Sequence, residues 1–161
     1  MIISQATLSF LTVYPSTWSA NWIWGLPLIV FTVVIHVFGM GFVCQRAIRV
    51  SNTERRHPTV MLVVIVGATT LLATSLHAAE AGIWAAAYRL LSALPNDKSA
   101  ILYSLGAITS YGHASLFLEG RWQLMGAMEA LNGWLLFGLT TAFLFGVIEK
   151  IGLLSSSLSR R

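Results

Sequence analysis

The chain has 161 residues, of which 56% are hydrophobic and only 10% are charged. Soluble domains carry roughly 25% charged residues, so this composition excludes an ordinary water-soluble globule. The length fits one domain, and the single cysteine, Cys44, excludes an intrachain disulfide.

The formal net charge of +4 is distributed as in a membrane protein. No charged residue precedes Arg46, and most of the basic residues belong to two groups: Arg46, Arg49, Arg55 and Arg56, then Lys150, Arg160 and Arg161. A nucleic-acid-binding protein would instead present a basic stripe on a solvated face. We therefore expect no nucleic acid as a partner, and expect both basic groups to contact anionic lipid headgroups.

The first 21 residues are apolar but are interrupted by Pro15, and no charged region precedes a cleavage site. This pattern predicts an interfacial segment over residues 1–21 rather than a cleaved signal peptide. Trp18, Trp22 and Trp24 lie where an aromatic belt would anchor the first membrane helix.

A membrane-spanning helix needs about 20 mainly apolar residues. Three segments meet this length: 22–48, with Pro27 in its first turns; 59–84, continuing more amphipathically toward Leu94; and 122–151. Residues 22–95 would thus form two spanning helices joined by a basic cytoplasmic loop, and residues 152–161 a cytoplasmic tail. Three crossings put the termini on opposite sides, and the basic groups then place the N-terminus outside and the C-terminus in the cytoplasm.

Residues 96–121 connect the second and third spanning helices. Pro95 ends a helix, Asn96 or Asp97 would cap the next one, and the apolar stretch 100–109 is too short to span. Small residues follow at 110–115. The pattern fits a re-entrant loop, which is tolerated at membrane depth where protein or a watery cavity surrounds it. It equally fits a periplasmic loop with an interfacial helix.

The run 103–115 resembles the pore helix and selectivity filter of prokaryotic potassium channels, whose pattern is Thr-Thr-Val-Gly-Tyr-Gly-Asp. In chain order, the positions of that pattern are taken by Thr109, Ser110, Tyr111, Gly112, His113, Ala114 and Ser115. The segment 133–142 is similar to the inner helix of these channels, whose two glycines have the spacing of Gly133 and Gly138. The segment 126–133 has close counterparts in small bacterial ion-channel proteins.

The resemblance covers residues 100–151, about a third of the chain. Together with the three apolar spans, it implies an all-α membrane protein with three transmembrane helices, in which residues 96–151 form a re-entrant pore helix, a filter loop and the inner helix. One loop cannot enclose a pore axis, so several copies must assemble symmetrically in the bacterial inner membrane, and the resemblance implies a homotetramer. No cofactor is expected beyond a permeant K⁺ or other monovalent cation. The ions would be bound by backbone carbonyls that replace the hydration shell, from Ser110, Tyr111, Gly112, His113 and Ala114.

Two filter positions depart from the family pattern. Ala114 carries a Cβ where the family has a glycine, and Tyr111 is larger than valine. A nonselective pore, a pH-sensitive pore and a non-conducting relative therefore stay open. The His113 ring would pack where tyrosine braces the filter, so that its protonation would disturb the loop. The alternative is a simple loop histidine.

Helical spacing places one stripe on the third spanning helix, made of Trp134, Phe137, Thr141, Phe145 and Ile148. By the resemblance, this stripe lines the cavity, and Phe145 narrows the cytoplasmic mouth as a hydrophobic gate. The alternative is a face that packs on lipid or on neighbouring helices. Gly133 and Gly138 would act as hinges, or would let helices approach closely.

Three ionisable residues inside the predicted spanning helices are functional candidates by default. His77 and Glu80 share a helical face. They would support the filter or sense protons, or would form a structural hydrogen-bonded pair. Glu129 is expected to bond to the pore loop behind the filter.

His36 and His77 raise another class of function, a membrane haem or metal protein. Counted from the cytoplasmic helix ends at 1.5 Å per residue, they lie at depths of about 18 and about 27 Å, which argues against a shared haem. A zinc site of His77, Glu80 and His113 lacks a recognised spacing. No catalytic motif is visible, so we expect no enzyme. A non-conducting accessory or structural membrane subunit is the remaining alternative.

Overall fold

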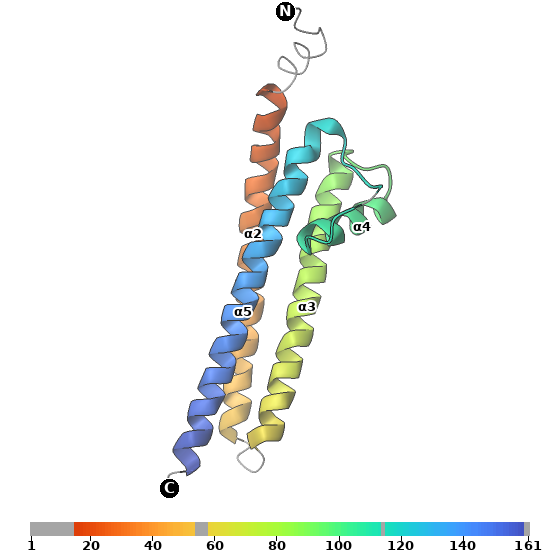
Figure 1. The fold of residues 1–161 in the computed structure, drawn as a ribbon. Coiled ribbons are helices and arrows are strands. Elements are labelled where there is room, and N and C mark those ends of the chain that lie inside the picture. The colour runs from red at the N-terminus through yellow and green to blue at the C-terminus, as the bar shows by residue number, and fades with distance from the viewer. Residues whose placement is uncertain (1–14, 54–57, 114, 160–161) are drawn as a thin grey trace, which may run out of the picture. The chain divides into compact units, whose positions relative to one another are not determined.

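The computed structural model describes residues 15–53, 58–113 and 115–159, and all regular elements within these ranges are helical. The three long helices are α2 (Pro15–Thr53), α3 (Pro58–Leu90) and α5 (Gln123–Ser159). The short helix α4 (Asp97–Ile108) and a turn of 3-10 helix, η1 (Gly120–Trp122), connect α3 to α5 (Figure 1). The predicted all-α fold class is confirmed.

Each long helix contains a stretch that is long and apolar enough to cross a membrane. These candidate spans are Trp18–Arg46, Val60–Leu90 and Gly120–Lys150. They overlap the three segments predicted from apolar length. The described part of the chain therefore has the helices of a multi-pass membrane protein.

The first long helix begins earlier than predicted. α2 starts at Pro15, so Pro27 lies inside the helix rather than in its first turns. Residues 1–14 of the predicted interfacial segment lie outside the described residues, as do residues 54–57 and 160–161 with four of the basic side chains. The predicted contacts of those side chains with lipid headgroups stay predictions.

The second long helix includes most of the predicted amphipathic extension beyond Trp84 but ends at Leu90, four residues before Leu94. Ser92 adopts a left-handed backbone conformation, with φ 53°. The Ala93 N–H then donates to the Tyr88 carbonyl at 2.9 Å. This is the Schellman arrangement, in which a left-handed residue after the last turn closes the free carbonyls and stops the helix.

The chain packs as two compact units, to which α2, α3 and α5 each contribute a part. Unit 1 comprises Met1–Thr32 and Glu80–Trp134, and unit 2 comprises Val33–Ala79 and Leu135–Arg161. Unit 1 contains α4 and a hydrophobic core in which Trp84, Tyr88 and Met125 have no exposed surface. In unit 2, Ile65 and Val147 form a smaller buried cluster, against which Cys44 packs.

Polar side chains in unit 1 join α2 to α5. The Asn21 side chain donates from Nδ2 to the Arg121 carbonyl at 2.7 Å and accepts the Met125 N–H on Oδ1 at 3.0 Å. The first N–H groups of a helix have no partner within it, so Asn21 caps α5 from another helix. Further along, Asn132 Nδ2 donates to Thr32 Oγ1 at 2.8 Å, and both residues are fully buried.

Candidate functional site

The sequence of α4 defines both of its ends. The Asn96 side chain accepts the Ser99 N–H at 2.9 Å, as expected for a helix cap, and Asp97 adds negative charge to the first turn. At the other end, the Thr109 hydroxyl donates to the Leu105 carbonyl at 2.6 Å. Arg89 pairs with Asp97 at 2.6 Å, but both side chains are more than a third exposed, so the pair adds little stability.

α4 runs back alongside the candidate spans instead of lying beyond their ends. The Ser104 hydroxyl donates to the Ala81 carbonyl at 2.6 Å, and Ala81 lies inside the candidate span of α3. The last residue of α4, Ile108, packs against Gly133, which lies inside the candidate span of α5. A Cβ on Gly133 would be 2.7 Å from the Ile108 carbonyl carbon. The C-terminal half of α4 therefore packs against residues of two candidate spans, next to α3 in Figure 1.

A buried carboxyl group joins the three helices of unit 1 that meet at α4. The Tyr88 hydroxyl of α3 donates to Glu129 Oε2 of α5 at 2.7 Å, and the Ser104 hydroxyl of α4 contacts Glu129 Oε1. All three residues have no exposed surface. Hydrogen bonds to a charged or ionisable partner in a dry interior hold their groups strongly in place, so Glu129 fixes the position of α4 against α3 and α5.

An aromatic stack connects this centre to the loop that follows α4. The His113 ring stacks on Tyr103, with centroids 4.3 Å apart and planes at 19°, and Tyr103 meets Tyr88 edge-on at 5.5 Å. The Tyr103 hydroxyl packs against Gly126 of α5. Among the described residues, His113 Nε2 is buried and has no hydrogen-bond partner.

The loop turns directly back over α4. The Gly112 N–H donates to the Gly106 carbonyl at 3.1 Å, and the His113 ring lies where a Cβ on Gly106 would be. Two loop residues have left-handed backbones, Ser110 with φ 55° and Gly112 with φ 79°. The Glu119 N–H reaches the Ala93 carbonyl at 3.2 Å. The segment 109–119 therefore returns along α4 to the end of α3.

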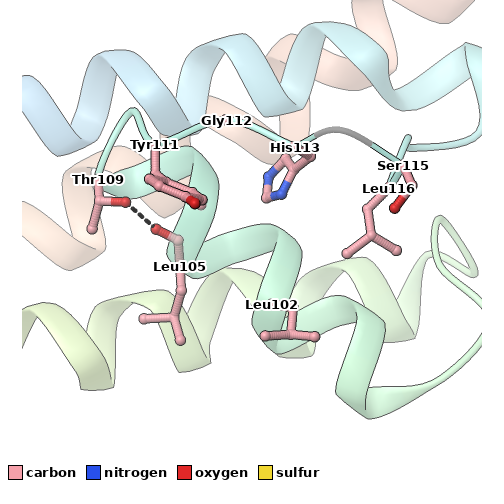
Figure 2. Close-up of a pocket in the computed structure, with 9 residues that line it drawn as sticks. Leu102, Leu105, Thr109, Tyr111, Gly112, His113, Ser115 and Leu116 are labelled. Carbon is pink, nitrogen blue, oxygen red and sulfur yellow. Dashed lines mark hydrogen bonds between the residues drawn. The ribbon is translucent and has the colours of Figure 1, made fainter.

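A cavity of about 390 Å³ is lined by residues of α4 and of the loop. Figure 2 shows the Thr109–Leu105 hydrogen bond at one end and the His113 ring directed toward α4. The other residues that line the cavity belong to α4 and the loop and are mostly apolar: Leu102, Gly106, Tyr111, Gly112, Ser115 and Leu116. The cavity is open to the surface, so it is a groove and not an enclosed chamber.

The residues predicted to form the filter lie on this one loop. Ser110 and Tyr111 are exposed, the latter at 90%, whereas His113 is half-buried. Ala114 lies outside the described residues. On α5, the predicted pore-lining side chains Trp134, Phe137, Thr141 and Phe145 are all exposed, and their spacing puts them on one stripe.

The other predicted site residues each have different surroundings. Glu129 bonds to α4 through Ser104 rather than to the loop itself, among the described residues. Gly133 allows close approach of α4, whereas a Cβ on Gly138 would meet no described atom within 4 Å. Glu80 has no exposed surface. His113, a candidate zinc ligand by residue type, contacts Tyr103 and Gly106.

The depth argument against a His36–His77 pair is wrong. Their ring centroids are 5.1 Å apart, and both Nε2 atoms lie within hydrogen-bonding distance of the Thr140 hydroxyl. α2 runs on to Thr53 and α3 begins at Pro58, so the two histidines stand almost equally far from the shared turn. A haem does not fit between them, because the rings are already in contact and share one hydroxyl.

Sequence reasoning did not find Tyr88, Tyr103, Ser104 or the cap at Asn21. The available signal was a polar atom inside an apolar helix, which must find a partner in a membrane. That signal marks the residues but does not name the partners. A comparison of the chain with protein-family models, curated proteins and solved structures gives no match.

Proposed function

We propose that the chain is the pore-forming subunit of a homotetrameric channel for monovalent cations. In this proposal α4 is a re-entrant pore helix, and the loop 109–113 lines the ion path. The observation that supports the proposal is the contact of α4 with Ala81 and Gly133, both inside candidate spans. A non-helical loop at that depth is tolerated where it lines a watery path.

The backbone conformation of the loop favours an alignment with the potassium-channel filter pattern that differs from the alignment based on residue type. Its two left-handed residues, Ser110 and Gly112, are separated by one residue, as are the two glycines of the potassium-channel pattern. In this register Ser110 takes the place of the first glycine, Tyr111 that of the tyrosine, and His113 that of the aspartate. It lies two residues earlier than the register based on residue type alone.

The carbonyls of the loop would replace part of the hydration shell of an ion. The C-terminal end of α4 carries the negative end of the helix dipole, and it points toward the loop at Thr109. Both features favour a cation. The Tyr103–His113 stack and the bond from Gly112 to Gly106 would hold the loop against α4.

Several copies are proposed because one loop encloses no axis and closed symmetry is the rule for such assemblies. The number four is taken from the potassium channels that the loop resembles. The exposed Tyr111, Trp134 and Phe137 would then be covered by neighbouring copies or face the pore. We place the N-terminus outside and the C-terminus in the cytoplasm of a bacterial inner membrane, since most basic residues flank the α2–α3 turn and the end of α5.

The test is ion flux from liposomes that contain the purified protein, under K⁺ and Na⁺ gradients. Gly112→Ala introduces a Cβ at φ 79°, where it meets no described atom within 4 Å, so it changes only the backbone preference of the loop. Gly120→Ala is the matched control, because Gly120 is equally open and has no positive φ.

Flux that is lost in Gly112→Ala and kept in Gly120→Ala would support a path through this loop, and the ion ranking would report its selectivity. Absence of flux from a folded tetramer would indicate a non-conducting relative of such channels. Absence of both flux and tetramer would overturn the proposal in favour of an accessory membrane subunit.

A further inference from the structure

In unit 2, the imidazole rings of two histidines converge on the hydroxyl group of one threonine. One of these three residues lies on each of α2, α3 and α5. His36 Nε2 on α2 lies 2.9 Å from Thr140 Oγ1 on α5, and His77 Nε2 on α3 lies 3.3 Å from the same oxygen. The ring centroids are 5.1 Å apart, with the planes tilted by 43°. The same nitrogen of each ring is therefore directed at the same point.

A purely structural contact between helices does not require two histidines. Thr32 and Asn132 join α2 to α5 in unit 1 through neutral side chains alone. A hydroxyl has one hydrogen, so Thr140 donates to at most one of the two rings. His36 has no exposed surface, and all three residues lie inside candidate spans. Ionisable residues at such positions are costly and mark functional sites.

The arrangement suits a metal ion. The Nε2 atom of neutral imidazole is a ligand of Zn²⁺ and related first-row ions, with metal–nitrogen distances of about 2.0–2.1 Å. Small rotations of the two rings would bring both nitrogens to that distance from one ion beside Thr140 Oγ1.

We propose that His36 and His77 bind a divalent first-row transition-metal ion of the Zn²⁺ type within unit 2. The Thr140 hydroxyl orients the two rings and is not itself required as a ligand. A bound ion links α2 to α3 within the spans. The site is independent of the proposed ion path, so the failure of one proposal leaves the other standing.

The experiment titrates the purified, tag-free protein with Co²⁺, whose visible absorption bands report tetrahedral nitrogen and oxygen ligation. We expect saturation at about one ion per chain and loss of the bands when Zn²⁺ is added. In His36→Gln and His77→Gln, affinity should fall by more than the roughly 10–100-fold that the loss of an outer partner costs. Thr140→Val should stay within that range.

His113→Gln is the control, since this histidine packs on Tyr103 in unit 1 and should leave the titration unchanged. Zinc-edge X-ray absorption of the wild-type protein, which counts imidazole ligands, gives the same answer if the glutamine variants do not fold. Absence of Co²⁺ bands from the folded wild type, or bands of full strength in both glutamine variants, would overturn the proposal.

Discussion

Substitution of Gly133 by alanine tests the packing of α4 against α5. The new Cβ would lie 2.7 Å from the carbonyl carbon of Ile108 and 3.0 Å from its Cα, and closer still to the carbonyl oxygen. These are backbone atoms at the end of α4, so no side chain can rotate away. Ordinary contacts begin at 3.4 Å, so the carbonyl carbon alone requires a shift of about 0.7 Å and the closer oxygen requires a larger one. Either α4 must move by more than that or α5 must bend.

The cost follows from two opposing effects. Overpacking of a tight interior typically costs about 1–3 kcal/mol, and the helix preference of alanine over glycine offsets about 1 kcal/mol of it. We expect a net loss of about 1–2 kcal/mol of unfolding free energy, since the obstacle is backbone. In a chain of this length each kcal/mol corresponds to about 2–4 °C in Tm. Flux should also be lost, because the loop follows the displaced end of α4.

Gly138→Ala is the matched control on the same helix. A Cβ there would meet no described atom within 4 Å, so only the helix preference acts, and Tm should stay level or rise slightly. Thermal unfolding in detergent and liposome flux are measured on both variants. A Gly133→Ala protein with unchanged Tm and unchanged flux would refute the close approach of α4, and with it the re-entrant arrangement. Loss of flux in a stable Gly138→Ala protein would instead identify Gly138 as a hinge.

Three further substitutions test the surroundings of α4. Ser110→Gly should raise stability by about 1 kcal/mol, because it relieves a left-handed serine; a lower denaturation midpoint would contradict this. Ser104→Ala should cost about 1–3 kcal/mol by leaving the Glu129 carboxyl group without its partner on α4, whereas the exposed Ser115→Ala should not change Tm. Asn21→Ala should cost about 0.5–2 kcal/mol and speed hydrogen exchange at the Met125 amide; equal exchange rates would rule out the cap.

Much of the local structure could be predicted because it depends on neighbours in the chain. Apolar length determined the three candidate spans, since a helix of about 20 residues suffices to cross a bilayer. The cap at Asn96 and the short helix after it follow from residues within one turn of each other. The left-handed backbone at Ser110 could not be predicted in this way, since residue type favours glycine for that conformation.

Tertiary structure alone decided which polar groups meet. The sequence marked Glu129 as an ionisable residue in a span, but Tyr88 and Ser104 became its partners only when three helices packed together. His36 and His77 show that a sequence-based argument can also wrongly separate two residues that are in contact. Their depths were counted from assumed helix ends, and an error of about one turn in α2 was enough to separate two rings that lie in contact. Residue spacing along one helix is a local property, whereas the register between helices depends on where each helix ends and on the side chains that pack between them.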